Sequence, residues 1–260
     1  MNHPVDIQFL TLSTAKKKNY YKRNPVQEAV FEIRFASSHW DSASAGQIYE
    51  ILKSKFPVKK DAPPLLLNLG LQDPISAPLP LSAPVMQAWT ADETFLLQFG
   101  PRIATANSLL YESWETFTDN VELLVEAFLE VTNPKNLTRV GVRFINRFEF
   151  SEDILDISDY LNFAIILPPH LQQVSKLEFV VESLYSLEDH GYLTKSKIST
   201  QLEEERTVII LDLECFRDFS EQPNGERLLV YGNNCHNIVE VIFESFLRDK
   251  MRDQLGVYKK

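Results

Sequence analysis

Three arginines recur at every fourth position of the stretch RVGVRFINRFEF, residues 139–150. A β-strand directs side chains four residues apart to the same face, about 13 Å from one another at ~3.3 Å per residue. Arg139, Arg143 and Arg147 therefore form a row on one face of this predicted strand, here called the arginine ladder. Guanidinium groups present a planar fork of donors that suits carboxylates and phosphates.

Two interpretations of the arginine ladder stay open. Glu28 and Glu32 share the same four-residue spacing in the stretch NPVQEAVFEIRF, residues 24–35. If the two strands are neighbours, these carboxylates lie opposite the guanidinium groups and form a salt-bridged outer face, each pair stabilising by roughly 0.2–1 kcal/mol. Alternatively, the ladder binds an anion or a partner protein.

Two asparagines occupy otherwise apolar strand faces. Asn146 lies opposite the arginine ladder, among valines and phenylalanines, and Asn107 shares a face with Ile103 in RIATANSL. A buried amide without a partner costs about 1–3 kcal/mol, so both need hydrogen bonds. We expect them either to tie strand ends or loop backbone together, or to form a polar pocket between sheet and helices with Arg102 and Tyr111.

A short basic segment with tyrosines stands near the N-terminus. It favours either a solvated arm or a grip on nucleic acid through charge and base stacking. The net charge of −10 disfavours nucleic-acid binding by the chain as a whole, because phosphate neutralisation needs clustered cations. The residues of this basic arm are Lys16, Lys17, Lys18, Tyr20, Tyr21, Lys22 and Arg23.

Catalytic and metal-binding motifs are sparse. Asp212 and Glu214 alternate in LDLE and, as a pair of carboxylates on one strand face, could hold Mg²⁺ in a nuclease or hydrolase. The two cysteines, Cys215 and Cys235, have no C-x-x-C spacing, and glycine-rich phosphate loops do not occur. We expect no cofactor and lean against enzymatic activity, with the metal-dependent hydrolase as an alternative.

Composition bounds the class of protein. The chain has 260 residues, of which 44% are hydrophobic and 24% charged, which is typical of soluble globular proteins. Apolar runs fall short of the ~20 residues of a membrane span, and the start MNHPVDIQFL lacks a secretion-signal pattern. Two unpaired cysteines suit a reducing compartment. We expect a cytoplasmic protein without membrane contact.

Periodicity predicts the elements that position these side chains. Period-two segments predict strands, apolar stripes at helical spacing predict helices, and half of the 14 prolines fall in a loop between Pro57 and Pro84. Ser42 or Ser44 is the expected cap of the first helix, and Gly256 that of the last. The expected strands are 24–35, 85–89, 94–100, 102–109, 139–150, 172–185, 191–199 and 206–214, and the expected helices are 44–56, 115–132, a short one within 151–163, and 234–255.

The order of elements repeats. VELLVEAFLE (121–130) and VEVIFESFLR (239–248) agree at five of ten positions, and EIRF (32–35) matches GVRF (141–144) in its last two residues. We therefore expect an internally duplicated α+β fold, with an antiparallel sheet or sheets and helices packed on one face. The expected parts are a basic N-terminal arm (1–23), a first repeat (24–137) with the proline-rich loop, and a second repeat (138–260).

Four segments carry a resemblance to a known family. NPVQEAVFEIRF, QFGPRIATANSLLYESWETF, RVGVRFINRFEF and HNIVEVIFESFLRDKM resemble a sporadically distributed family of bacterial proteins of about this length, most specifically in R-F-I-N-R at 143–147. That family often has an aspartate between the proline and arginine of GPR, which this chain lacks, and this weakens a role for Arg102. The resemblance implies no activity, and the patchy occurrence of the family implies mobile or defence-related gene clusters.

The sequence as a whole favours a non-enzymatic binding or regulatory protein that contacts another protein or a second copy of itself. The apolar stretch PPLLLNLGL (63–71) is expected either to dock such a partner or to cover the sheet. Nucleic-acid binding by the basic arm and the ladder, and metal-dependent hydrolysis, are the two alternatives.

Overall fold

The computed structural model of this chain describes residues 20–62, 83–150, 156–168, 178–187, 191–203 and 206–258. The first half of the chain contributes β1 (Tyr20–Tyr21), β2 (Val26–Ser37), α2 (Ser44–Leu52), β3 (Val58–Asp61), β4 (Met86–Trp89), β5 (Phe95–Gly100), β6 (Ile103–Ser108) and α3 (Trp114–Thr132). The second half contributes β7 (Lys135–Phe150), α4 (Ile157–Tyr160), β8 (Val180–Leu187), β9 (Tyr192–Glu203), β10 (Arg206–Glu221), α5 (Gly225–Phe246), α6 (Asp249–Leu255) and β11 (Val257–Tyr258).

The described strands pair in the order β3-β4-β5-β6-β2-β7-β10-β9-β8, and β1 pairs separately with β11. The expected α+β class with an antiparallel sheet is confirmed. The chain divides into two compact units. Unit 1 comprises Met1–Gln27, Val142–Phe216 and Asn233–Lys260, and unit 2 comprises Glu28–Gly141 and Arg217–Gly232, so β2, β7, β10 and α5 contribute to both.

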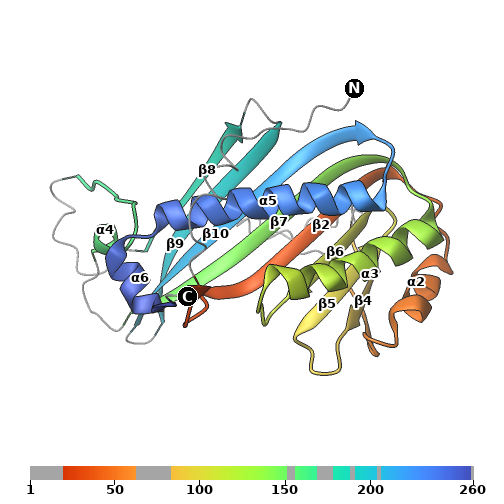
Figure 1. Ribbon diagram of the computed structural model, residues 1–260, viewed down its shortest axis with the longest axis horizontal. Helices are drawn as coiled ribbons and strands as arrows, with labels where there is room; N and C mark the ends of the chain where they lie inside the picture. The colour runs from red at the N-terminus through yellow and green to blue at the C-terminus, as the bar shows by residue number, and fades with distance from the viewer. Residues whose placement is uncertain are drawn as a thin grey trace. The chain divides into compact units, whose positions relative to one another are not determined.

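Unit 2 packs α2 and α3 on one face of its strands. In Figure 1, α3 crosses β5 and β6, with α2 beside it. The ring of Phe35 from β2 stacks on Phe128 from α3, with centroids 5.4 Å apart. The Ser113 side chain caps α3 by accepting from Thr116 N, and Asn133 ends it in the left-handed region. This apolar layer makes the opposite, helix-free face of β2 and β6 the polar one.

Unit 1 packs the C-terminal part of α5 on its own strands (Figure 1). The rings of His236 from α5 and Phe144 from β7 lie 5.8 Å apart, and Asn234 donates to the Tyr192 hydroxyl of β9 at 3.0 Å. Near the C-terminus, the ring of Tyr160 in α4 meets that of Phe150 edge-on at 4.8 Å. Within the described residues, no helix is long and apolar enough to cross a membrane.

Strand β7 shows the expected alternation in full. Val140, Val142 and Phe148 are buried, whereas the intervening arginines reach solvent, Arg143 most of all. The strand is longer than its apolar pattern indicated, because Lys135 and Asn136 continue its backbone without contributing buried side chains. The expected strands 85–89, 94–100 and 102–109 and the expected helix 115–132 also form, within two residues at their ends.

Two segments differ from expectation around the proline-rich loop. Residues 58–61 form β3, paired antiparallel with β4, although they were expected in a loop. The pairing with β4 explains this strand, in which Val58 and Lys60 are half-buried and Lys59 and Asp61 are exposed. Residues 63–82, which include the apolar stretch 63–71, lie outside the described residues.

The first helix begins at Ser44 as predicted, but it ends at Leu52 instead of residue 56, and its N-cap differs from the expected one. Ala43 is the N-cap of α2 and makes no side-chain cap, so neither Ser42 nor Ser44 fills that role. Asp41 supplies the acceptor instead, taking hydrogen bonds from the backbone N–H groups of Ala43 (2.8 Å) and Ser44 (2.9 Å). Ile51 is 46% exposed, because the apolar residues that α2 buries are Ile48 and Leu52.

The predicted last helix is two helices, and it begins nine residues earlier than expected. The Asn224 side chain accepts a hydrogen bond from Arg227 N and caps the start of α5. In the sequence, the pair Asn224-Gly225 is typical of a turn, so it did not indicate a helix start. Leu247 pairs with Leu161 in an isolated bridge, and this backbone pairing interrupts the helix before α6. Gly256 caps α6 as expected, with φ of 71°. The short helix expected within 151–163 spans only Ile157–Tyr160 of its described part.

Gly232 of α5 tests the packing of unit 2, because a Cβ there would lie 2.6 Å from Cε2 of the buried Phe31 ring. We expect Gly232→Ala to lower the free energy of unfolding by about 1–3 kcal/mol through overpacking, despite the better helix propensity of alanine. Denaturant unfolding measures this change.

Gly225→Ala is the matched control, since its Cβ would meet Leu129 Cδ1 at an ordinary 3.5 Å. Phe31→Leu in the Gly232→Ala background should recover part of the loss. Equal stability of the two alanine variants would contradict this packing.

Candidate functional site

The arginine ladder lies on the helix-free face of β7, and carboxylates from other strands reach each of its members. Arg139 lies beside Glu32 of β2, with its Nε 3.3 Å from Oε1, and Asp218 of β10 lies 4.0 Å from its Nη1. The Arg139–Glu32 contact is an ion pair without the alignment of a hydrogen bond. Glu32 also accepts two hydrogen bonds from Arg34, at 2.8 and 2.9 Å, so one carboxylate serves two guanidinium groups.

Arg143 makes the most regular contact of the ladder. Its Nε and Nη2 donate to the two carboxylate oxygens of Asp212 on β10, at 2.7 and 2.6 Å. Such a fork-to-fork pair fixes both groups in orientation as well as in distance. Asp212 is only 13% exposed, so this ion pair is better shielded from solvent than most surface pairs.

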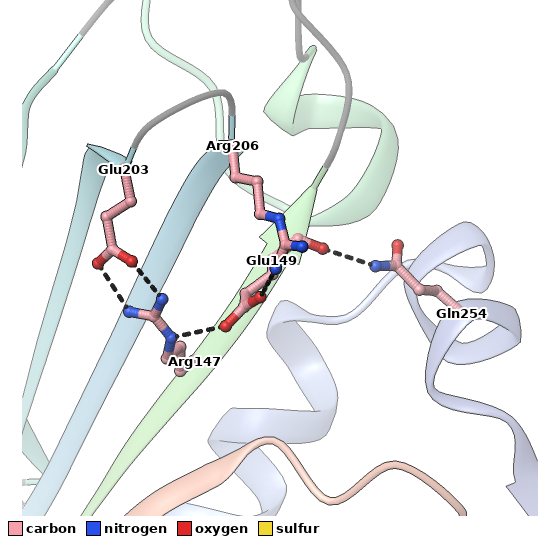
Figure 2. A network of polar contacts seen from close by, with 5 residues as sticks. All are labelled: Arg147, Glu149, Glu203, Arg206 and Gln254. Carbon is pink, nitrogen blue, oxygen red and sulfur yellow. Dashed lines mark hydrogen bonds and ion pairs between the residues drawn. The ribbon is translucent and has the colours of Figure 1, made fainter.

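Arg147 belongs to a network at the end of β7, drawn in Figure 2. Its Nη1 and Nη2 donate to Glu203 of β9 at 3.0 and 2.7 Å, and its Nε donates to Glu149 at 3.0 Å. Arg206 donates to the other oxygen of Glu149, and Gln254 of α6 donates to the Glu149 backbone carbonyl. The face therefore alternates in charge.

The charges in this network shift one another's protonation. The hydrogen bonds from Arg147 lower the pKa of the Glu203 and Glu149 carboxyl groups, and the hydrogen bond to Glu203 raises the pKa of the Arg147 guanidinium. All of these carboxylates belong to the chain itself. The arginine ladder consequently carries little uncompensated positive charge toward solvent.

The two asparagines hold different positions. Asn146 is buried on the α5-covered face, and its Nδ2 donates to the Leu211 carbonyl of β10 at 3.0 Å. Asn107 pairs across from Val30 of β2, on the face away from Phe31 and the helices, and donates to Glu28 at 2.7 Å. Asn146 belongs to unit 1 and Asn107 to unit 2, and each is hydrogen-bonded within its own unit.

Asn107 instead belongs to a row of side-chain hydrogen bonds that crosses four strands of unit 2, from Trp89 of β4 to Glu28 of β2. Trp89 Nε1 donates to Gln87, Gln87 donates to Gln98, and Gln98 donates to Asn107, at 3.1, 2.8 and 3.1 Å. Each amide is thus both donor and acceptor, which satisfies polar groups that are nearly buried. These side-chain hydrogen bonds link β4, β5, β6 and β2 in addition to their backbone pairing.

Arg102 and Tyr111, expected beside these amides, occupy loops. Arg102 lies in the turn between β5 and β6, where its carbonyl accepts from Phe35 N. The Tyr111 ring meets Phe117 of α3 edge-on, with centroids 6.1 Å apart. Both contacts lie within unit 2, whereas Asn146 belongs to unit 1.

The described part of the basic arm is fastened to the C-terminal segment. Tyr20 and Tyr21 form β1 against β11, and the backbone N–H groups of Lys22 and Arg23 donate to the carbonyls of Gly256 and Leu255. The Tyr21 hydroxyl donates a hydrogen bond to Glu244 at 2.7 Å. Burial raises the pKa of Tyr21, and the hydrogen bond to the Glu244 carboxylate raises it further. Lys16, Lys17 and Lys18 lie outside the described residues.

The expected metal pair is already engaged. Both Asp212 oxygens accept from Arg143, and among the described residues no group of three or more His, Cys, Asp or Glu side chains could hold a metal ion. Cys215 and Cys235 are buried free thiols. A metal at Asp212 and Glu214 would first have to displace the Arg143 guanidinium.

Strand β8 has a surface that sequence analysis missed. It ends the strand order, and beyond β9 no described strand pairs with it. Val180 and Leu184 are 65% and 64% exposed on one face, and Val181 and Tyr185 reach solvent on the other. The stretch VVESLYSL contains the signal, because its apolar residues fall on both strand faces, whereas a one-sided strand alternates.

The opposite end of the strand order is protected. β3 is four residues long and carries Lys59 and Lys60, and the Lys60 ammonium lies 4.5 Å from the Trp89 ring centre and 2.6 Å from Glu93. Short, lysine-bearing edge strands resist unwanted pairing. β8 has twice that length and a single charged side chain, Glu182. It is therefore the less protected edge.

No protein-family model matches the chain, and no curated protein matches it. The geometry of the ladder and of β8 alone carries the assignment of a site.

Arg147 gives a pH-dependent test of the network in Figure 2. The folded-state pKa values of Glu203 and Glu149 are lowered, so their pairing stabilises the fold above their unfolded pKa and is lost as pH falls through the folded pKa. We expect Arg147→Met to flatten the fall in unfolding free energy between about pH 5 and pH 3.

Lys135→Met serves as the control, because it removes one cation whose ammonium contacts Asn133. If both variants follow the wild-type pH profile, the carboxylates do not depend on Arg147.

Proposed function

We propose that this protein is a non-enzymatic binding or regulatory protein that acts through contact with another protein chain. The observation that supports this most directly is the exposed apolar edge strand β8. An unpaired strand edge offers a row of backbone donors and acceptors to an incoming strand, and exposed apolar side chains add buried area on contact. A cytoplasmic location, which the two cysteines favour, and a role in a mobile or defence-related gene cluster, which the family resemblance implies, belong to the same proposal.

The electrostatics support protein contact over nucleic-acid contact. Arg139, Arg143 and Arg147 all lie beside carboxylates of the chain, which has a net charge of −10. Phosphate binding would require those carboxylates to be displaced at each step of the ladder. Tyr21, proposed for base stacking, uses its ring edge against Phe243 and its hydroxyl on Glu244.

The fold supports a further part of the proposal, that the chain arose by internal duplication. Moving outward from β2 and β7, the order is β2, β6, β5, β4, β3 on one side and β7, β10, β9, β8 on the other, so β3 is one strand more than the second series has among the described strands. Each series is the first strand of a proposed repeat followed by its later strands in reverse, and each repeat closes with a long helix, α3 or α5. The proposed repeats are residues 24–137 and 138–260.

Co-purification tests the binding function. We expect a tagged wild-type chain, isolated from its native host, to retain a stoichiometric protein, either foreign or a second copy, that Leu184→Lys loses by about ten-fold or more. Quantitative mass spectrometry measures the ratio.

Leu110→Lys is the matched control, since Leu110 is 63% exposed, like Leu184, but lies between β6 and α3. Equal recovery with both variants, or steeply salt-dependent recovery of nucleic acid alone, would overturn the proposal.

A further inference from the structure

We infer that the partner of β8 is β8 of a second copy, so that the protein forms an antiparallel, edge-to-edge dimer. This inference rests on the proposed function, because it names the occupant of the same strand. It commits to a self-complementary contact rather than to a foreign peptide.

The backbone of β8 is ready for such pairing. Every residue from Val180 to Leu187 is in register with β9, from Ser199 to Tyr192, so the strand is paired along its whole length without a bulge. At about 3.4 Å per residue, eight residues present an edge of roughly 27 Å. Antiparallel pairing is the mode that two identical edges adopt about a two-fold axis perpendicular to the sheet.

The charge of β8 permits two copies to meet. Glu182 is its one charged residue, and Lys195 of β9 lies 2.9 Å from it while Lys197 of β9 is its partner in the strand register. Each copy therefore brings one net positive charge to the contact zone, which is small beside the −10 that each chain carries overall. Repulsion between the two chains is screened beyond about 8 Å at physiological ionic strength. Dimerisation should consequently strengthen as salt is added.

The side-chain pattern selects the register. A two-fold axis perpendicular to the sheet pairs residues that lie on the same face of the two strands. The axis therefore lies midway between the two copies of one residue, and the choice of that residue sets the register. An axis at Glu182 would oppose two carboxylates, which is destabilising. An axis at Leu184 opposes the two Leu184 side chains on one face and pairs Val181 with Leu187 of the second copy on the other. Glu182 then faces Ser186, and no like charges meet.

A cysteine at the proposed axis gives the sharpest test. Directly opposed residues of antiparallel strands have Cα atoms about 4.5–5.5 Å apart, within the range a disulfide spans. We expect Leu184→Cys to form a disulfide-linked dimer on mild oxidation at least about ten-fold faster than Leu110→Cys. The native Cys215 and Cys235 are buried, so background cross-linking stays low.

Sedimentation of the unmodified protein provides the second measurement. We expect a dimer that dissociates on dilution, strengthens with salt and is lost in Leu184→Lys. A wild-type monomer at about 100 µM, with Leu184→Cys no faster than Leu110→Cys, would overturn the inference. If the wild type is a monomer and Leu184→Lys still loses a foreign protein, the proposed function stands with that protein as the occupant of β8. If Leu184→Lys loses neither a second copy nor a foreign protein, both the dimer and the proposed function are overturned.

Discussion

The two-sided character of β7 is the constraint on which the rest of the structure depends. One face buries Val140, Val142 and Phe148, which requires helices above it. The other face must then hold three guanidinium groups at the surface beside strands β2, β9 and β10. Those strands supply Glu32, Asp212 and Glu203, so the neighbours of β7 match its charge as well as its hydrogen bonds. A strand order that separated β7 from β10 would leave Arg143 without its bidentate partner.

Period-two and helical patterns were enough to predict the α+β class and most elements. These patterns succeeded where one face of an element is buried and the other is exposed to solvent, as in β7 and α3, because the apolar residues then recur at the period of the element. They failed where backbone contacts decide. β3 forms because it pairs with β4, and α5 ends because Leu247 pairs with Leu161, and neither contact leaves a local sequence signal.

The candidate site was predictable in part. The spacing of the arginines indicated a common face, but it could not show which carboxylates pair with them. Asp212 and Glu203 each lie more than 50 residues after their arginine partner in the sequence. Asn107 and Asn146 were visible as buried amides, yet their partners, Glu28 and the Leu211 carbonyl, depend on strand register. The apolar edge of β8 resembled any other strand until its place in the strand order was known.

Neutralisation of the arginine ladder within the chain is tested most directly by a double-mutant cycle on Arg143 and Asp212. The cycle compares the unfolding free energies of wild type, Arg143→Met, Asp212→Asn and the double variant. We expect a favourable coupling of about 0.5–1 kcal/mol, as for a well-aligned surface ion pair. Strictly additive effects, or a gain in stability on removing Arg143 alone, would contradict this neutralisation.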